Sequence, residues 1–310
     1  MPDTSPKPVM SSQDARFGKR GRFSRESLSP WLFLLPALII FTWFKFYPML
    51  SGLQMSFYDV QFYSASKWVG FANFTRAFAS EDLAIAVGHT AIYVIFSLVF
   101  SIIFAFALAL GLEGPARHLG IIRTAIFLPA ITSAAVLAQV WQLIFNSAPY
   151  GVVNTLIGYL GIAPQGFLSD PHQALGTLVL LEVWKDTPYD MMIFIAGLAG
   201  INRELYDAAD VDGAGWWRKL LHVTLPGSIP AISVVIILSL IRGFRVFAEV
   251  YATTGGGPAG STETIMTYIY KAGFNEFNYG YASAVSFLLL IFTILLTLIH
   301  LRLKAWIAKD

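Results

Sequence analysis

The 310-residue chain contains no cysteine, and only 13% of its residues are charged. The missing cysteines exclude disulfide bonds, cysteine-ligated metals and cysteine nucleophiles. Soluble domains carry about 25% charged residues, so the low charge argues against a water-soluble domain. Hydrophobic residues make up 56% of the chain, which is typical of a protein that crosses a membrane several times.

Long apolar runs are what the sequence has instead. A helix needs about 20 apolar residues to cross the hydrocarbon core of a bilayer, and a helix satisfies its own backbone hydrogen bonds in lipid. We therefore predict an all-α membrane protein with six transmembrane helices. The predicted spans are approximately residues 31–50, 87–111, 122–145, 174–199, 228–250 and 281–303.

The lysine and arginine residues predict how these spans are oriented. Fourteen of them would lie on one side of the membrane, namely Lys7, Arg16, Lys19, Arg20, Arg22, Arg25, Arg117, Arg123, Arg203, Arg218, Lys219, Arg302, Lys304 and Lys309. Only Lys67, Arg76 and Lys271 would lie on the other side. The positive-inside rule then places both termini in the cytoplasm. We expect residues 1–28 to form a disordered, basic cytoplasmic tail and residues 29–310 to form the transmembrane domain.

A polar stretch, residues 203–226, separates the fourth and fifth predicted spans. It contains Asp207-Ala208-Ala209, Gly213 and Val223-Thr224-Leu225-Pro226 at fixed spacing. This stretch resembles the signature loop of ABC-importer permease subunits, with Asp207 and Val223 as conservative departures. The resemblance implies a type I ABC importer permease fold, in which this loop forms a cytoplasmic coupling helix that docks on the ATP-hydrolysing subunit. The docking residues it implies are Glu204, Tyr206, Asp207, Ala208, Ala209, Asp212, Gly213, Leu225 and Pro226.

Two further segments refine the resemblance. Residues 254–258, Thr-Gly-Gly-Gly-Pro, and residues 68–74, Trp-Val-Gly-Phe-Ala-Asn-Phe, are similar to segments of the maltose-type branch of carbohydrate-importer permeases. The resemblance implies the first of two paired permeases, in the bacterial cytoplasmic (inner) membrane. The implied partners are a second homologous permease, two copies of an ATP-binding subunit, an extracellular or periplasmic solute-binding protein and the lipid bilayer, with no nucleic acid.

ATP chemistry is not expected from this chain itself. Residues 255–262 have the glycine spacing of a phosphate-binding loop, but Ser261 stands where the phosphate-binding lysine must be. The five histidines are scattered, and no metal cluster or nucleophile–base pair is apparent. We therefore expect a non-catalytic subunit that binds no cofactor and no metal, with ATP and Mg²⁺ used by the partner ATPase subunits.

Ionisable residues inside predicted spans are costly in lipid and usually face a cavity. Lys185 and Asp186 in the fourth span, and Arg242 and Arg245 in the fifth, are candidates to face the pore. Glu182 is spaced to neutralise Lys185, and Glu249 is expected near an outer span end, within reach of the interface. By resemblance the substrate pathway comprises Trp184, Lys185, Asp186, Tyr189, Arg242, Gly243, Phe244, Arg245 and Val246.

The residues of the fifth span also bear on the substrate. Many relatives carry aspartates where this chain has Arg242 and Ala248. The difference predicts a more cationic cavity and favours a sugar derivative with an acid group, which arginine binds through charged hydrogen bonds. A neutral disaccharide, a polyol and glycerol phosphate remain alternatives.

The main competing class is an ion- or proton-coupled secondary sugar transporter. Such proteins use internal repeats and broken spans at the membrane midplane. Prolines occur within the predicted spans, but no internal repeat is visible, and a docking loop has no role in that class. A requirement of uptake for ATP and a binding protein would separate the two classes.

Overall fold

The computed structural model describes residues 25–60 and 65–307. The chain divides into two compact units, Met1–Gly52 and Leu53–Asp310, and each is described by itself. Most of the tail predicted to be disordered lies outside the described residues. Residues 25–28 are helical instead and form the first turn of the helix Arg25–Phe41.

The first unit holds helix α1 (Arg25–Phe41) and a π-helical turn, η2 (Thr42–Phe46), which leads into α2 (Tyr47–Met55). Residues Trp31–Met55 form one candidate membrane span of 25 residues. The predicted first span therefore exists, and its helix continues about one turn beyond the predicted end at residue 50.

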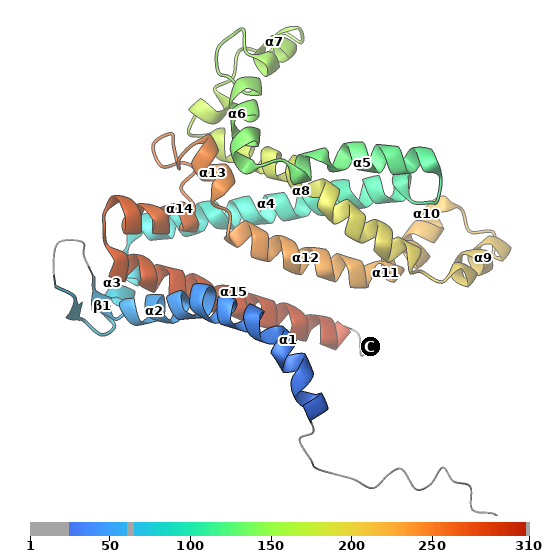
Figure 1. Cartoon of the computed structure of the whole chain (residues 1–310). Helices are drawn as coiled ribbons and strands as arrows, with labels where there is room; N and C mark the ends of the chain where they lie inside the picture. The colour runs from blue at the N-terminus through green and yellow to red at the C-terminus, as the bar shows by residue number, and fades with distance from the viewer. Residues whose placement is uncertain (1–24, 61–64, 308–310) are drawn as a thin grey trace, which may run out of the picture. The chain divides into compact units, whose positions relative to one another are not determined.

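The second unit is built around three helices that pack against one another: α4 (Glu81–Leu112), α8 (Ala174–Ala199) and α12 (Ile229–Phe244). Figure 1 shows α4, α8 and α12 running alongside each other. The remaining elements are β1 (Tyr58–Asp59), β2 (Lys67–Trp68), α3 (Ala72–Ala79), α5 (Arg117–Ile131), α6 (Ala134–Ile144), α7 (Val152–Gly158), η3 (Phe167–Ser169), α9 (Arg203–Val211), α10 (Trp216–Lys219), η4 (Leu220–Thr224), α11 (Leu225–Gly227), α13 (Ala248–Thr253), α14 (Ile265–Tyr270), η5 (Lys271–Asn275) and α15 (Tyr279–Ile307).

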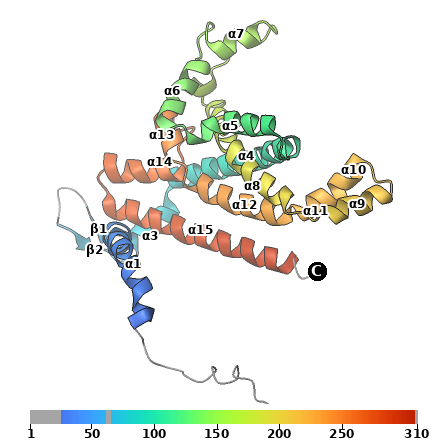
Figure 2. The ribbon, with the colours of Figure 1, turned by 45° about the vertical axis from the view of Figure 1, so that its right-hand side comes forward.

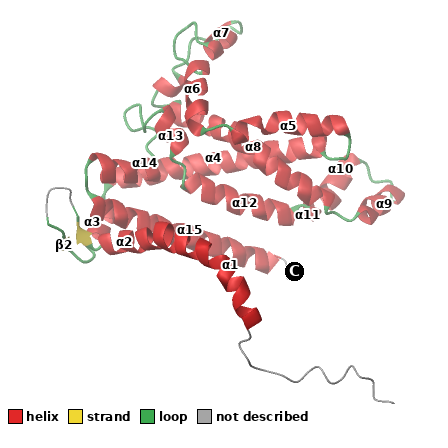
Figure 3. Ribbon diagram, in the orientation of Figure 1, coloured by secondary structure: helices red, strands yellow, loops and turns green. Residues whose placement is uncertain are grey.

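Different helices lie at the two ends of this unit. In both Figure 1 and Figure 2, α9 and α10 lie at one end of the helices, and α6, α7 and α13 lie at the other. The strands β1 and β2 form a short antiparallel hairpin that pairs Tyr58 with Trp68, and the elements around it are almost all helical (Figure 3). The candidate coupling loop and the candidate outer segments are thus held apart by the length of the bundle.

Within the described residues, three helices are long and apolar enough to cross a membrane, and five segments are if each of two bent pairs counts as one span. The three are Trp31–Met55, Glu81–Leu112 and Tyr279–Lys304. Helix α8 matches the predicted fourth span, residues 174–199. Its 26 residues would reach about 39 Å, but it carries four ionisable residues between Glu182 and Asp190.

Two predicted spans are broken in the structure. The predicted helix 122–145 is divided into α5 and α6, which meet at 97°. Thr132 is extended, and Ser133 caps the start of α6 by accepting a hydrogen bond from the Val136 amide at 3.5 Å. The predicted helix 228–250 ends at Phe244 and restarts as α13. Both predictions assumed that an apolar run stays helical throughout. A serine cap overrides that pattern at α6, whereas α13 restarts after Phe247 without a side-chain cap.

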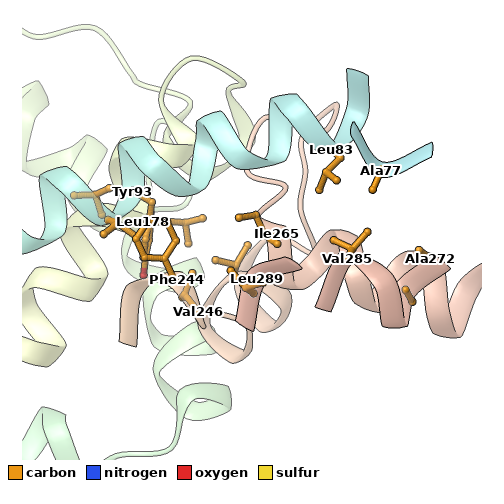
Figure 4. Close-up of a cluster of buried hydrophobic side chains, with 14 of the residues drawn as sticks. Ala77, Leu83, Tyr93, Leu178, Phe244, Val246, Ile265, Ala272, Val285 and Leu289 are labelled. Atoms are coloured by element: carbon orange, nitrogen blue, oxygen red, sulfur yellow. The ribbon is translucent and has the colours of Figure 1, made fainter. Parts of the chain in front are cut away.

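Two hydrophobic clusters stabilise the second unit. One joins α4, α8, the end of α12, α14 and α15, and Figure 4 shows Tyr93, Leu178, Phe244 and Ile265 among its side chains. The other lies farther along α4, α8 and α12 and includes residues such as Phe194. Between the clusters, all three helices carry polar side chains, namely Ser97, Ser101, Glu182, Lys185, Asp186, Asp190, Ser239 and Arg242.

Candidate functional site

The polar segment of α8 presents an acidic face. Glu182, Asp186 and Asp190 follow each other at intervals of four residues, and this spacing aligns side chains on one side of a helix. Glu182 and Asp190 are buried, with Asp190 fully so. Buried carboxylates need partners that supply charge or hydrogen bonds, and two basic residues supply them here.

Lys185 is the first of these basic residues. Its Nζ lies 2.9 Å from Glu182 Oε2 and 2.6 Å from Glu249 Oε1. A third carboxylate, Asp186, lies 3.5 Å away. Because Glu249 belongs to α13, this lysine ties α8 to the helix that follows the break in the fifth predicted span.

Arg242 is the second basic residue. Its Nε lies 2.9 Å from Asp186 Oδ2, and its Nη2 lies 2.7 Å from Asp190 Oδ1. The other oxygen of Asp190 accepts a hydrogen bond of 2.8 Å from Ser101 of α4. The guanidinium also lies over the ring of Tyr189, 5.2 Å from its centroid. Arg242 thus links α12 to α8 and, through Asp190, to α4.

The ion pairs bear on the expectation of a more cationic cavity. Lys185 and Arg242 together face four carboxylates, those of Glu182, Asp186, Asp190 and Glu249. The expectation placed Glu249 near the interface and did not include Asp190, and the cationic character of the cavity remains a prediction. The break after Phe244 turns α13 back toward α8, so Glu249 reaches Lys185 instead.

Arg245 differs from Arg242 although it lies only three residues away. It follows the end of α12, is exposed, and forms no ion pair with any described residue. It lines a cavity of about 340 Å³, together with Lys185, Arg242 and Glu249 among others. Within the described chain, Arg245 is therefore the basic residue at this cavity whose positive charge no carboxylate neutralises.

The other predicted pathway residues separate into two groups. Trp184 and Tyr189 are exposed, at 44% and 45%, so their rings are accessible. Phe244 and Val246 are buried in the hydrophobic cluster, and a Cβ on Gly243 would come within 2.9 Å of Val94 Cγ2. Phe244 and Gly243 thus pack α12 against its neighbours, and their place in the substrate pathway remains a prediction. Val246 has its side chain in the core but still borders the cavity.

The candidate docking loop forms two short helices, α9 and α10. Asn202 caps α9 by accepting a hydrogen bond from the Glu204 amide at 3.0 Å. Gly213 separates the helices with φ of +69°, a left-handed conformation that glycine adopts without a Cβ penalty. Lys219 of α10 pairs with Asp210 of α9, which closes the two helices on each other.

This loop exposes both charge and apolar surface. Asp207 and Asp212 are exposed, as are the large side chains of Leu205, Val211, Trp216, Trp217, Leu221 and Leu225. Tyr206, by contrast, is half-buried, and its hydroxyl lies 3.0 Å from Thr224 Oγ1, which ties α9 to the start of the next span. Pro226 begins α11, where a missing N–H costs nothing. A contiguous apolar surface of this kind usually marks a protein interface.

Sequence reasoning missed Glu249, Asp190 and Ser101 as members of the charged cluster. The four-residue spacing of Glu182, Asp186 and Asp190 was a usable signal for Asp190. The partnership of Glu249 with Lys185 joins residues 64 positions apart, and no local pattern contains it.

Comparison with known proteins identifies the family. Residues 90–309 match the family described as "Binding-protein-dependent transport system inner membrane component". The chain is 32% identical over 289 residues to the arabinooligosaccharides transport system permease protein of Bacillus subtilis, covering 93% of this chain and 92% of the relative. It is 30% identical over 279 residues to the trehalose/maltose transport system permease protein of Thermococcus litoralis, covering 90% and 94%.

Solved structures extend this finding to the fold. A chain of a bacterial ABC transporter involved in the import of the acidic polysaccharide alginate superposes with a TM-score of 0.80 at 27% identity, covering 91% of this chain and 97% of the other. The fold is therefore that of ABC-importer permeases, which confirms the type I expectation at this level.

The chain belongs to the binding-protein-dependent transport system inner membrane component family. It is a permease subunit of an ABC importer and a multi-pass membrane protein. Such subunits are the non-catalytic components of these transporters, which confirms the expectation of a non-enzymatic chain. The secondary-transporter alternative is set aside by this membership.

Proposed function

We propose that this permease carries a sugar or sugar derivative across the membrane, through the cavity lined by Lys185, Arg242, Arg245 and Glu249. The cavity is lined by ionisable groups inside a helical bundle, and the exposed rings of Trp184 and Tyr189 belong to the same segment of α8 as Lys185. Charged groups in a membrane bundle mark a polar pathway, and aromatic rings suit the apolar faces of sugars. The relatives named for arabinooligosaccharides and for trehalose/maltose support a carbohydrate as the cargo.

The proposed topology has six spans with both termini in the cytoplasm. Helix α8 supplies the fourth span, because its four ionisable residues are paired inside the bundle and do not face lipid. The bent pairs α5–α6 and α10–α12 supply the third and fifth spans. The excess of lysine and arginine beside α9 and α10 supports a cytoplasmic position for that loop.

The exposed surface of α9 and α10 is the proposed docking site for the ATPase subunit. One permease provides one such surface, so a complex with a second homologous permease would engage two ATPase copies. These subunits would bind ATP and Mg²⁺, and a solute-binding protein would deliver the sugar from the opposite side. The apolar and acidic side chains exposed around Asp207 are the observation that supports this arrangement.

The charge balance favours a neutral sugar as the substrate. Within the described chain, carboxylates outnumber the two bases that they pair with, so the charges of Lys185 and Arg242 are compensated. An acidic sugar is the second candidate, because Arg245 is exposed and unpaired at this cavity. The similarity to the alginate-importer chain supports that candidate.

Uptake by the reconstituted importer tests this function. The permease, its paired permease, the ATPase and the binding protein would be assembled in proteoliposomes and supplied with a panel: maltose, trehalose, lactose, arabinotriose, glycerol 3-phosphate and an alginate trisaccharide. We expect ATP- and binding-protein-dependent uptake of a carbohydrate. Uptake that persists without either component would refute the importer mechanism, and failure of every carbohydrate would refute the proposed substrate class.

A further inference from the structure

A second cavity lies one helical turn from the charged one along α13. Glu249 lines the charged cavity and Thr253, four residues later, lines the second. Four residues of α-helix rise about 6 Å. The second cavity has a volume of about 480 Å³, and its walls come from α6, the loop after it, η3, α13 and the Gly-Pro loop. In the proposed topology it lies on the outer side of the charged cavity.

The lining of this outer cavity is polar but uncharged. The described residues around it include no ionisable side chain, and they supply amides and hydroxyls from Gln142, Asn146, Ser147, Ser169, Thr253 and Thr254. Uncharged donors and acceptors around a concave surface suit a ligand rich in hydroxyl groups. The charged cavity beside it is lined by acidic and basic side chains, so the walls of the two cavities differ in their chemistry.

Several of these polar groups are still free to bind. Gln142 donates its amide to the Thr253 carbonyl at 2.6 Å, which leaves its side-chain oxygen available. Asn146 accepts a hydrogen bond from Ala148, which leaves its NH₂ group available. The hydroxyl of Thr253 is buried and has no partner within the described part of the chain. The Thr253 oxygen is closed off from solvent, so the accessible free groups at the wall are those of Gln142 and Asn146.

An aromatic ring completes the site. Phe145 lines the cavity and is held rigidly, because it stacks on Trp141 at a centroid distance of 4.6 Å and meets the ring of Phe167 edge to face at 5.2 Å. Trp141 in turn contacts Trp184, 5.8 Å away, which precedes Lys185 of the charged cavity. A fixed aromatic face beside amides and hydroxyls matches a pyranose or furanose ring, which has an apolar C–H face and a polar rim.

We infer that this cavity is an outer carbohydrate subsite, which binds an uncharged sugar unit before or while a neighbouring unit occupies the charged cavity. The inference rests on the proposed transport of a carbohydrate. The two cavities together would favour substrates of more than one sugar unit.

The absence of cysteine from the chain makes a direct test possible. Ser147→Cys and Ser169→Cys place single thiols in the cavity wall, and Ser66→Cys places one on an exposed loop as a control. The assembled importer in nanodiscs, without the binding protein, would be treated with a methanethiosulfonate reagent. Each member of the uptake panel would be present at millimolar concentration.

We expect at least one carbohydrate of the panel to slow modification of both wall thiols by roughly threefold or more, and to leave the Ser66→Cys rate unchanged. Asn146→Asp, which keeps the side-chain shape and the acceptor for the Ala148 amide but removes the free NH₂ group, should weaken that protection by roughly two- to tenfold, the effect of one hydrogen bond. Phe145→Ala should abolish it.

Two outcomes would overturn the subsite. Protection by the sugar-free binding protein, with none from any carbohydrate, would make this face a protein-docking surface. Absence of protection by every panel sugar would also overturn it, whether or not uptake is observed. The uptake assay tests the proposed function separately. Transport of a sugar that does not protect the wall thiols would refute the subsite and leave the proposed function intact.

Discussion

Arg242 and Arg245 offer a matched pair for testing what the charged cavity does. Both are arginines at the end of α12 and both line the same cavity. Arg242 is held by Asp186 and Asp190, whereas Arg245 has no ion-pair partner among the described residues. We therefore expect Arg242→Gln to act on stability and Arg245→Gln to act on the substrate.

The magnitudes follow from these contacts. Removing one member of a buried ion pair typically costs about 3–5 kcal/mol. The loss of stability caused by Arg242→Gln should lie near the lower end of this range, because Asp190 keeps its hydrogen bond from Ser101 and Asp186 stays near Lys185. A hydrogen bond to a charged group contributes about 1.5–3 kcal/mol. Arg245→Gln should therefore reduce uptake of an acidic sugar roughly 10- to 100-fold, and that of a neutral sugar by less than about tenfold.

Two measurements separate these effects. Thermal unfolding of the assembled importer in nanodiscs should show a lowered Tm for Arg242→Gln and an unchanged one for Arg245→Gln. Initial uptake rates with an alginate trisaccharide and with maltose should identify the charge preference, since only the Arg245→Gln variant should alter their ratio. The reasoning is refuted if Arg242→Gln leaves the Tm unchanged, or if Arg245→Gln destabilises the complex as much as its neighbour does.

Three further outcomes are expected. Gly213→Ala should weaken stimulation of the ATPase, because a Cβ is penalised at φ of +69°. The control variant Gly215→Ala should have a much smaller effect, because Gly215 has φ of −69°. Equal effects of the two variants would argue against a turn requirement at Gly213. Asp190→Asn should lower the Tm of the complex, since it leaves Arg242 with one carboxylate fewer in the bundle; an unchanged Tm would contradict the buried ion pair. The permease reconstituted without its partners should show no uptake, and robust ATP-independent transport by this chain alone would contradict the importer assignment.

The sequence predicted the bounds of a helix correctly where the helix coincides with an apolar run. Helix α8 begins and ends where the pattern placed it, at residues 174 and 199. The pattern failed at Ser133, where a serine cap and an extended Thr132 redirect the chain by 97°. Hydropathy averages over many residues, so one or two residues that change direction leave almost no trace in it.

The candidate site was predicted in part for a related reason. The resemblance pointed to the middle of α8 and the end of α12, and Lys185, Asp186 and Arg242 do meet there. The pairing of Glu249 was not predicted, because Glu249 reaches the cluster only after the chain breaks at residues 245–247. Pairing across 64 residues depends on tertiary packing, which a single sequence does not contain.

The charged cluster also explains how the fifth span can break within the bundle. Ending α12 at Phe244 leaves α13 without the support of a continuous helix, since backbone groups near a helix end lose their intrahelical partners. Lys185 holds α13 through Glu249, while Arg242 holds α12 through Asp190, so both sides of the break are fastened to α8. The break leaves Arg245 exposed at the charged cavity and brings Thr253 to the wall of the outer cavity. The ion pairs therefore position the candidate pathway, and the groups free to meet a substrate are the ones that these pairs leave unused.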